Sequence, residues 1–132
     1  MNRLPGQEAA ALIALAERYF AAVDRKDVAA TLACFAPVAR FTIATFSKVY
    51  QGRDTEIAAM FKRLNERYAQ VWHGDFEHVC DGPAQCIASR FRVENITHEG
   101  QKLVKNNCNF FRVQDGLLTE VCVYMSGDNS LA

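Results

Sequence analysis

Histidine and carboxylate side chains suit proton transfer, and a candidate pair is Asp24, which ends the first predicted helix, with His73, which opens the strand after the third predicted helix. An imidazole titrates near neutral pH, so a histidine can take a proton from a substrate and later return it. A carboxylate on one ring nitrogen fixes the tautomer and stabilises the cation that forms when the other nitrogen is protonated. His73 is therefore the candidate base and Asp24 the candidate residue that orients it. A structural interpretation stays open, because Arg25 and Lys26 follow Asp24 and the three residues can simply form a solvated turn.

His78, five residues further along, competes with His73 for the role of base. Successive side chains of a strand point to opposite faces, so two histidines five positions apart face opposite sides of a sheet. Gly74 lies between them and can permit a β-bulge, which would reverse this relation. Which of the two histidines faces the pocket therefore depends on whether the backbone forms a bulge at Gly74.

Apolar residues at helical spacing predict the elements that must position these groups. Residues 7–24 form the first predicted helix, and Asp27 is expected to cap a short second helix that Pro37 prevents from running further. Asp54 or Thr55 is expected to cap a third helix. The apolar positions of the first and third helices are Leu12, Ala16, Tyr19, Phe20 and Val23, and Ile57, Met60, Phe61, Leu64 and Tyr68.

Extended apolar and β-branched runs predict strands on both sides of the third helix. One early strand is predicted over residues 38–46, and four later strands over residues 71–80, 86–97, 103–113 and 117–125. Turn residues separate the later runs, so these form consecutive hairpins and an antiparallel meander. The predicted fold class is α+β: one domain over residues 1–132, with a cone-like, curved antiparallel sheet wrapped around three N-terminal helices. An internal pocket is expected where the helices cannot fill the concave side.

The composition excludes several classes of partner. Fifteen basic and fifteen acidic side chains cancel, so no net field attracts nucleic acid or an anionic membrane. No apolar stretch reaches the ~18 residues of a membrane span. The five cysteines are an odd set without a CxxC pair, which fits neither a disulfide framework nor a zinc site, and no nucleotide-binding motif occurs. We expect a cytoplasmic protein with free thiols, no metal and no cofactor.

Four segments in order resemble the SnoaL-like, or nuclear-transport-factor-like, superfamily over roughly residues 10 to 128. They are Tyr19-Phe20-Ala21-Ala22-Val23-Asp24-Arg25-Lys26-Asp27, Leu32-Ala33-Cys34-Phe35-Ala36-Pro37, Tyr50-Gln51-Gly52-Arg53-Asp54 and Asn109-Phe110-Phe111-Arg112-Val113-Gln114-Asp115-Gly116. The resemblance implies the curved-sheet fold with a pocket. It does not settle the reaction, because the superfamily includes isomerases, dehydratases, cyclases, epoxide hydrolases and proteins without catalysis.

The resemblance also implies roles for four residues. Asp24 and His73 are placed like the Asp and His of scytalone dehydratase and of the hexachlorocyclohexane dehydrochlorinase, near the pocket. Tyr19 and Asn109 are placed like the two oxyanion-binding residues of ketosteroid isomerase, and an asparagine can also donate to an oxyanion. Ile43 stands where that isomerase has its base, which disfavours its mechanism. Tyr19 as a core tyrosine and Asn109 as a residue that satisfies neighbouring strands remain alternatives.

The strand around residues 89–95 alternates between polar and apolar side chains. If Phe91 and Val93 face the helices, Arg92 and Glu94 lie on the outer face of the sheet, and burial of the apolar pair favours this arrangement. The opposite phase would put Arg92 and Glu94 in the pocket, where Arg92 could contribute to an epoxide hydrolase site.

The last strand carries apolar side chains on both faces, because Cys122 and Tyr124 alternate with Val121 and Val123. Neither face is suited to water, so the outer face needs a cover. A twofold partner commonly packs there in this superfamily, and a homodimer is therefore expected.

The sequence thus favours a cofactor-independent lyase, isomerase or cyclase acting on a small, largely apolar substrate. The alternative is a non-catalytic module of the same fold that binds a small ligand or only dimerises. A cavity that contains Tyr19, His73 and Asn109, with Asp24 in hydrogen-bond reach of His73, would favour the enzyme. A pocket filled by Phe, Met and Trp side chains would favour the module.

Overall fold

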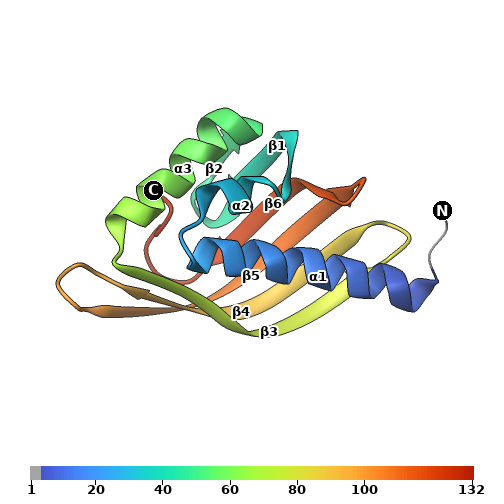
Figure 1. Ribbon diagram of the computed structural model, residues 1–132. Coiled ribbons are helices and arrows are strands. Elements are labelled where there is room, and N and C mark those ends of the chain that lie inside the picture. Colours follow the sequence, from blue (N-terminus) through green and yellow to red (C-terminus); the bar gives the residue numbers. More distant parts are fainter. Residues whose placement is uncertain (1–3) are drawn as a thin grey trace.

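The computed structural model describes residues 4–132, which begin with the helices α1 (Pro5–Asp24) and α2 (Val28–Leu32) (Figure 1). The five apolar positions predicted for the first helix are all buried. At the start of α2 the Asp27 carboxylate accepts a hydrogen bond from the backbone N–H of Ala30 at 3.0 Å, as expected of an N-cap. The predicted helical hairpin is therefore present, and Asp24 is the last residue of α1.

A single six-stranded sheet forms the other layer, in the order β2-β1-β6-β5-β4-β3. Its strands are β1 (Phe35–Ile43), β2 (Lys48–Gln51), β3 (Gln70–Asp81), β4 (Cys86–Ile96), β5 (Lys102–Gln114) and β6 (Leu117–Met125). The meander β3 to β6 is antiparallel as predicted, whereas β1 runs parallel to β6. A short turn forces neighbouring strands to alternate, but β1 reaches β6 through a long connection that leaves its direction free. The α+β fold class is confirmed, with a mixed sheet.

The first strand begins three residues earlier than the sequence predicts, at Phe35 instead of residue 38. Pro37 therefore lies inside β1, although proline cannot donate a ladder hydrogen bond. The register with β6 shifts between Phe35 and Arg40, so Pro37 falls in the irregular part of the pairing. After β1, the short 3-10 helix η1 (Ala44–Phe46) turns the chain into β2, an edge strand that is not among the five predicted strands.

The third helix, α3 (Ala58–Arg67), begins later than predicted. One π-helical turn, η2 (Gly52–Ile57), precedes it, and neither Asp54 nor Thr55 caps the α-helix. The prediction of an N-cap at these two residues is wrong, because both side chains find other partners within the turn.

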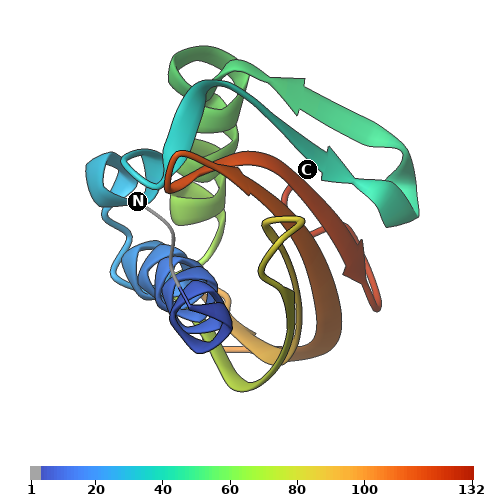
Figure 2. The ribbon, with the colours of Figure 1, turned by 90° about the vertical axis from the view of Figure 1, so that its right-hand side faces the viewer.

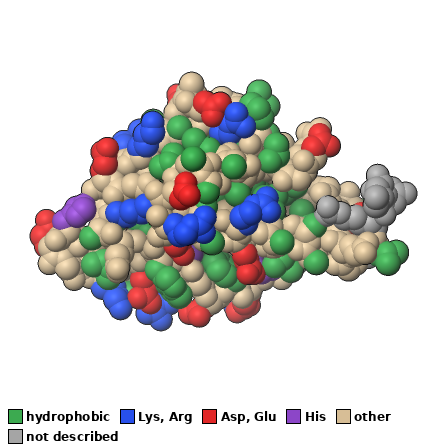
Figure 3. Space-filling view, in the orientation of Figure 1, with side chains coloured by type: hydrophobic (Ala, Val, Ile, Leu, Met, Phe, Trp, Pro, Cys, Tyr) green, Lys and Arg blue, Asp and Glu red, His purple; other side chains and the backbone are tan. Residues whose placement is uncertain are grey.

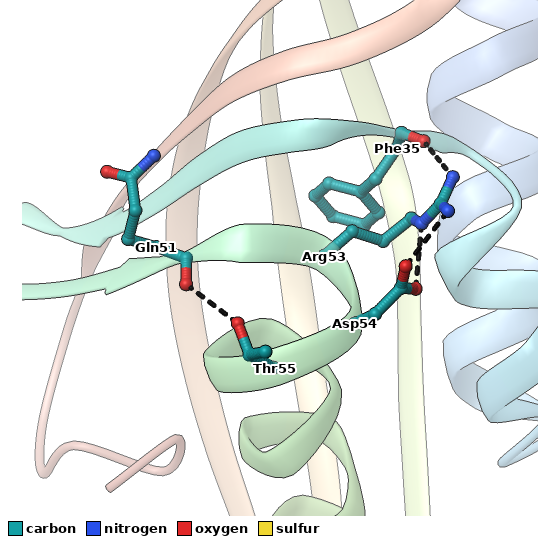
Figure 4. A network of polar contacts seen from close by, with 5 residues as sticks. All are labelled: Phe35, Gln51, Arg53, Asp54 and Thr55. Atoms are coloured by element: carbon teal, nitrogen blue, oxygen red, sulfur yellow. Dashed lines mark hydrogen bonds and ion pairs between the residues drawn. The ribbon is translucent and has the colours of Figure 1, made fainter.

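Those partners form a small polar network at the entry to α3 (Figure 4). The Arg53 guanidinium donates two hydrogen bonds to the Asp54 carboxylate at 2.9 and 3.0 Å and reaches the carbonyl oxygen of Phe35 at 3.5 Å. The Thr55 hydroxyl donates to the carbonyl oxygen of Gln51 at 3.2 Å. The network ties the turn before α3 to the first residue of β1.

The sheet curves around α1 and α3, which lie on its concave side (Figure 2). Aromatic rings from both layers meet there, with Phe20 and Phe61 from the helices and Phe35, Phe41 and Phe111 from the strands, all at most 3% exposed. The sequence predicts a pocket on this concave side.

The side chains of β4 alternate in the way that burial of the apolar residues favours. Phe91 and Val93 face the helices and are 3% exposed, whereas Arg92 and Glu94 lie on the outer face and form an ion pair of 3.1 Å. Arg92 therefore lies outside the interior. It cannot contribute to an epoxide hydrolase site in the pocket, which was the alternative that the opposite phase allowed.

Charges of both signs are interspersed on the helix-covered face, without a large area of one sign (Figure 3). Within the described residues, no helix has the length and apolar character needed to cross a membrane. All five cysteines are free thiols.

Candidate functional site

The end of α1 meets the start of β3 through Asp24 and His73. One carboxylate oxygen of Asp24 lies 2.6 Å from Nδ1 of His73, and the other accepts a hydrogen bond from the His73 backbone N–H at 3.1 Å. The side chains are 23% and 13% exposed, respectively. A single carboxylate thus holds both the ring and the backbone of the histidine, which restricts the rotation of the imidazole.

This contact determines which nitrogen of His73 can act as a base. An ionised carboxylate only accepts hydrogen bonds, so the shared proton resides on Nδ1. The neutral ring then carries its free electron pair on Nε2. The ring packs against Phe20 and Phe91, with centroids 5.1 and 5.5 Å away, and lines an interior cavity.

The cavity lies between the helices and the concave face of the sheet. It offers about 30 Å³ to the centres of water molecules, which is room for one or two waters. Apolar side chains form most of its wall, and the polar lining residues are Tyr19, His73, Asn95, Asn107, Asn109 and Ser130. The structure therefore brings Tyr19, His73 and Asn109 to one cavity, and connects Asp24 to it through His73. Phenyl rings also fill much of the space, as expected of a non-catalytic module.

Tyr19 lines this cavity and lies among aromatic rings. Its ring is within 6.1 Å, centroid to centroid, of those of Phe35, Phe61 and Phe111. Burial, together with the nearby Cys34 and Asp24, raises the pKa of the Tyr19 hydroxyl far above its usual range. The hydroxyl is therefore a permanent hydrogen-bond donor at neutral pH.

The raised pKa of Tyr19 predicts a loss of stability at alkaline pH. The unfolded chain releases this proton near pH ~10 while the folded chain keeps it, so the free energy of unfolding falls as the pH rises above that value. In a titration followed by phenolate absorbance, one of the four tyrosines should ionise only as the protein unfolds. Tyr19→Phe should remove this step and Tyr124→Phe, at an exposed position, should not. Equal alkaline stability of wild type and Tyr19→Phe would contradict the prediction.

Asn109 lies on β5 and is joined at the cavity by two asparagines that the sequence analysis did not select, Asn95 and Asn107. The side-chain oxygens of all three are buried and have no hydrogen-bond partner among the described residues. An unpaired buried polar atom costs about 1–3 kcal/mol. The signal was present in the sequence, because Asn95 continues the inward series Phe91, Val93, and Asn107 and Asn109 share one face of their strand.

His78 also faces inward but does not line the cavity. The β3 register shifts between Gly74 and Glu77, so a bulge reverses the alternation that separates the two histidines. Nδ1 of His78 lies 2.7 Å from the Ser89 hydroxyl and Nε2 lies 2.9 Å from the Glu17 carboxylate. Both ring nitrogens are thus engaged, and His78 links α1 to the sheet.

The C-terminal segment 126–131 covers one side of the cavity, where Ser130 and Leu131 contribute to the lining. Side chains from three elements hold its backbone carbonyls. Lys105 donates to the carbonyl oxygens of residues 126 and 128, Arg67 to that of residue 129 at 3.0 Å, and Tyr50 to that of Leu131 at 3.4 Å. The segment is therefore fixed over the cavity by contacts to its backbone.

Within residues 4–132, no three His, Cys, Asp or Glu side chains are grouped so that they could hold a metal ion. The polar groups at the cavity are an imidazole, which can transfer a proton, and a phenol, a hydroxyl and carboxamides, which can form hydrogen bonds.

Comparison with known proteins gives one family match. A family model described as SnoaL-like domain matches residues 16–121, a stretch that includes Tyr19, Asp24, His73 and Asn109. No curated protein matches the sequence.

Solved structures with the same fold come from bacteria and fungi. A protein from Xanthomonas campestris pv. campestris, provisionally assigned as a polyketide cyclase, has 23% identity and a TM-score of 0.80, with 89% of this chain and 91% of that chain covered. AusH from Aspergillus nidulans has 14% identity and a TM-score of 0.78, with 92% and 89% covered. A protein from Kribbella flavida DSM 17836, provisionally assigned as a ketosteroid isomerase, has 18% identity and a TM-score of 0.71, with 92% and 82% covered. At these identities the likeness concerns the fold.

Proposed function

Since this chain belongs to the SnoaL-like domain family, we propose that it is a cofactor-independent lyase, isomerase or cyclase that removes a proton from a carbon beside a carbonyl group. The observation that carries the proposal is the Asp24 carboxylate bound to both Nδ1 and the backbone N–H of His73. That arrangement leaves Nε2 as the free base at a mostly apolar cavity, which suits a small and largely apolar carbonyl compound.

The first step transfers a proton from the substrate carbon to Nε2 of His73. The electrons of the broken C–H bond move toward the carbonyl group and form an enolate, while the ring becomes an imidazolium. Asp24 accepts the Nδ1–H hydrogen bond and stabilises this cation. Asp24 is thus a positioning residue, and His73 is the catalytic base.

Tyr19 and Asn109 are the proposed donors to the enolate oxygen. The Tyr19 hydroxyl keeps its proton because burial raises its pKa, and the Asn109 carboxamide donates without needing any change of protonation. Preorganised donors of this kind stabilise charge that develops in the transition state. The enolate can then expel a β-hydroxyl group, be reprotonated at another carbon, or attack a second carbonyl group, which are the outcomes of a lyase, an isomerase and a cyclase.

A substrate needs more room than the cavity offers in this conformation. Sites for small molecules usually have volumes of about 300–1,000 Å³, against about 30 Å³ for water centres here. Binding is therefore coupled to movement of the lining side chains or of the C-terminal segment 126–131.

Hydrogen exchange in D₂O tests the proposal without knowledge of the natural product. Small enolisable ketones are incubated with the protein, and loss of the α-proton signal is followed by NMR. Catalysed exchange is expected for some members of such a panel. The second candidate, a module that binds a small ligand without catalysis, is favoured by the phenyl rings that fill the cavity. It predicts binding without any exchange above the buffer rate.

We also propose that a second copy of the chain covers the outer face of the sheet. Trp72, Val104 and Tyr124 are 41 to 55% exposed there. Charges of both signs lie between them, such as Arg90 and Glu77, which pair at 2.6 Å. Because the net charge is zero, two copies do not repel each other.

Tyr124→Arg is expected to convert the dimer to a monomer, because it buries an unpaired cation in the interface. Analytical ultracentrifugation of wild type and variant measures this. Ala10→Arg adds the same charge at an exposed position on α1 and should leave the dimer intact. A wild-type protein that sediments as a monomer at every concentration would contradict the proposal.

A further inference from the structure

Three asparagines that line the cavity have buried side-chain oxygens without a hydrogen-bond partner among the described residues: Asn95 on β4, and Asn107 and Asn109 on β5. Each residue is more than nine-tenths buried. Buried polar atoms are nearly always hydrogen-bonded in folded proteins, so three such oxygens around one cavity require an explanation. Asn109 already has a role in the proposed mechanism, whereas Asn95 and Asn107 have none.

The strand register defines where these two amides lie relative to His73. Asn95 pairs with Val71 on β3, two residues before His73, and diagonal neighbours of this kind lie ~7–8 Å apart. Asn107 lies on β5, two strands away from β3, and pairs with Phe91, two residues along β4 from the partner of His73, which gives roughly 12 Å at the usual strand spacing and rise. A ligand that touches the imidazole can therefore reach either amide with a substituent on one small ring.

The chemistry of the unpaired atoms selects the substituent. A side-chain oxygen of asparagine only accepts hydrogen bonds, so each of these unpaired oxygens needs a donor. Neither a methyl group nor a carbonyl group can supply one. A hydroxyl or enol group can, because its O–H donates.

We propose that Asn95 and Asn107 bind hydroxyl or enol groups, so that the ligand of this cavity is a compact molecule with at least two such groups. The position of its reacting carbon rests on the proposed function, because His73 defines that position. The preference for hydroxyl groups does not depend on turnover and can be measured by itself.

A pair of probes of similar shape tests this preference on the wild-type protein. Resorcinol has two hydroxyl groups on one ring, and m-xylene has methyl groups in their place. Titration of the ¹⁵N-labelled full chain should shift the side-chain NH₂ resonances of Asn95 and Asn107 with resorcinol, which should bind at least about tenfold more tightly than m-xylene. Equal or tighter binding of m-xylene, or no binding of either probe, would overturn the proposal.

Leucine substitutions provide a second and independent measurement. Asn95→Leu and Asn107→Leu remove an unpaired polar group from a buried position, so each variant should melt about 4 °C higher than wild type. The double variant should lose the preference for resorcinol. Asn106→Leu, on the exposed face of β5, is the matched control and should keep it. Leucine variants that melt lower than wild type, or that fail to fold, would mean that the amides support the structure and would overturn the proposal.

The two proposals fail in distinguishable ways. If wild type and His73→Ala both prefer resorcinol but wild type catalyses no proton exchange, the proposed function fails and the asparagine site stands. If wild type catalyses exchange but binds m-xylene as tightly as resorcinol, the function stands and the asparagine site fails.

Discussion

His73→Ala is expected to lower the rate of α-proton exchange by roughly 10²- to 10⁴-fold, the usual contribution of a positioned general base. The substitution removes Nε2 of His73. Among the described histidines, this is the only ring nitrogen at the cavity that has no hydrogen-bond partner. The ring packs against Phe20 and Phe91 at the edge of the aromatic core, so the variant should lose some stability but still fold. The kcat for a ketone that exchanges with wild type is the quantity to measure, with circular dichroism as the test of folding.

Two further histidine variants make this prediction specific. His98→Ala changes an exposed histidine whose Nε2 bonds to the Glu66 carbonyl oxygen, and it should leave the exchange rate unchanged. His78→Ala should weaken the packing of α1 on the sheet but keep exchange within about tenfold of wild type, because that ring is engaged with Ser89 and Glu17. Full activity of His73→Ala, or loss of activity only in His78→Ala, would show that the base has been misassigned.

Asp24→Asn is expected to lower kcat by roughly 10²- to 10⁴-fold while KM changes little. The carboxamide keeps the shape of the side chain but no longer stabilises the imidazolium, and its NH₂ group favours the tautomer with the proton on Nε2. The free energy of unfolding should also fall by about 1–3 kcal/mol, because the carboxylate accepts hydrogen bonds from both the ring and the backbone of His73.

A separate measurement distinguishes a positioning role from a merely structural one. Asp24→Glu should recover part of kcat, and ¹⁵N NMR of the ring should report the Nδ1–H tautomer in wild type and its loss in Asp24→Asn. Asp75→Asn, at an exposed position in the β3 bulge, is the matched control and should change neither quantity. An Asp24→Asn variant with wild-type kcat would contradict the proposed dyad.

The helices and the meander were predictable because their signals are local. The stripe that ends at Phe20 and Val23 follows the helical period, and hairpin turns separate the four later strands. The start of α3 was not predictable in this way. Asp54 has a side chain that is typical of an N-cap, but its carboxylate binds the neighbouring Arg53 guanidinium at 2.9 Å. The carboxylate therefore does not accept hydrogen bonds from the backbone N–H groups at the start of the helix.

The candidate site was predictable only in part, for a related reason. His73 and Asp24 could be selected by type and by resemblance, whereas Asn95 and Asn107 were passed over because an asparagine in a strand has many ordinary roles. Their unpaired oxygens become visible only when every neighbouring donor is known.

By itself, the sequence determined the fold class, the hairpin order and the inward phase of Phe91 and Val93, because periodicity and turn chemistry act over a few residues. Only the tertiary structure decided the parallel pairing of β1 with β6, the inward position of both His73 and His78, and the small size of the cavity. These depend on a bulge in β3, on the curvature of the sheet and on contacts between residues far apart in the chain, such as the 2.6 Å contact between Asp24 and His73. Local preferences do not determine such distances, because they arise from the packing of the whole chain.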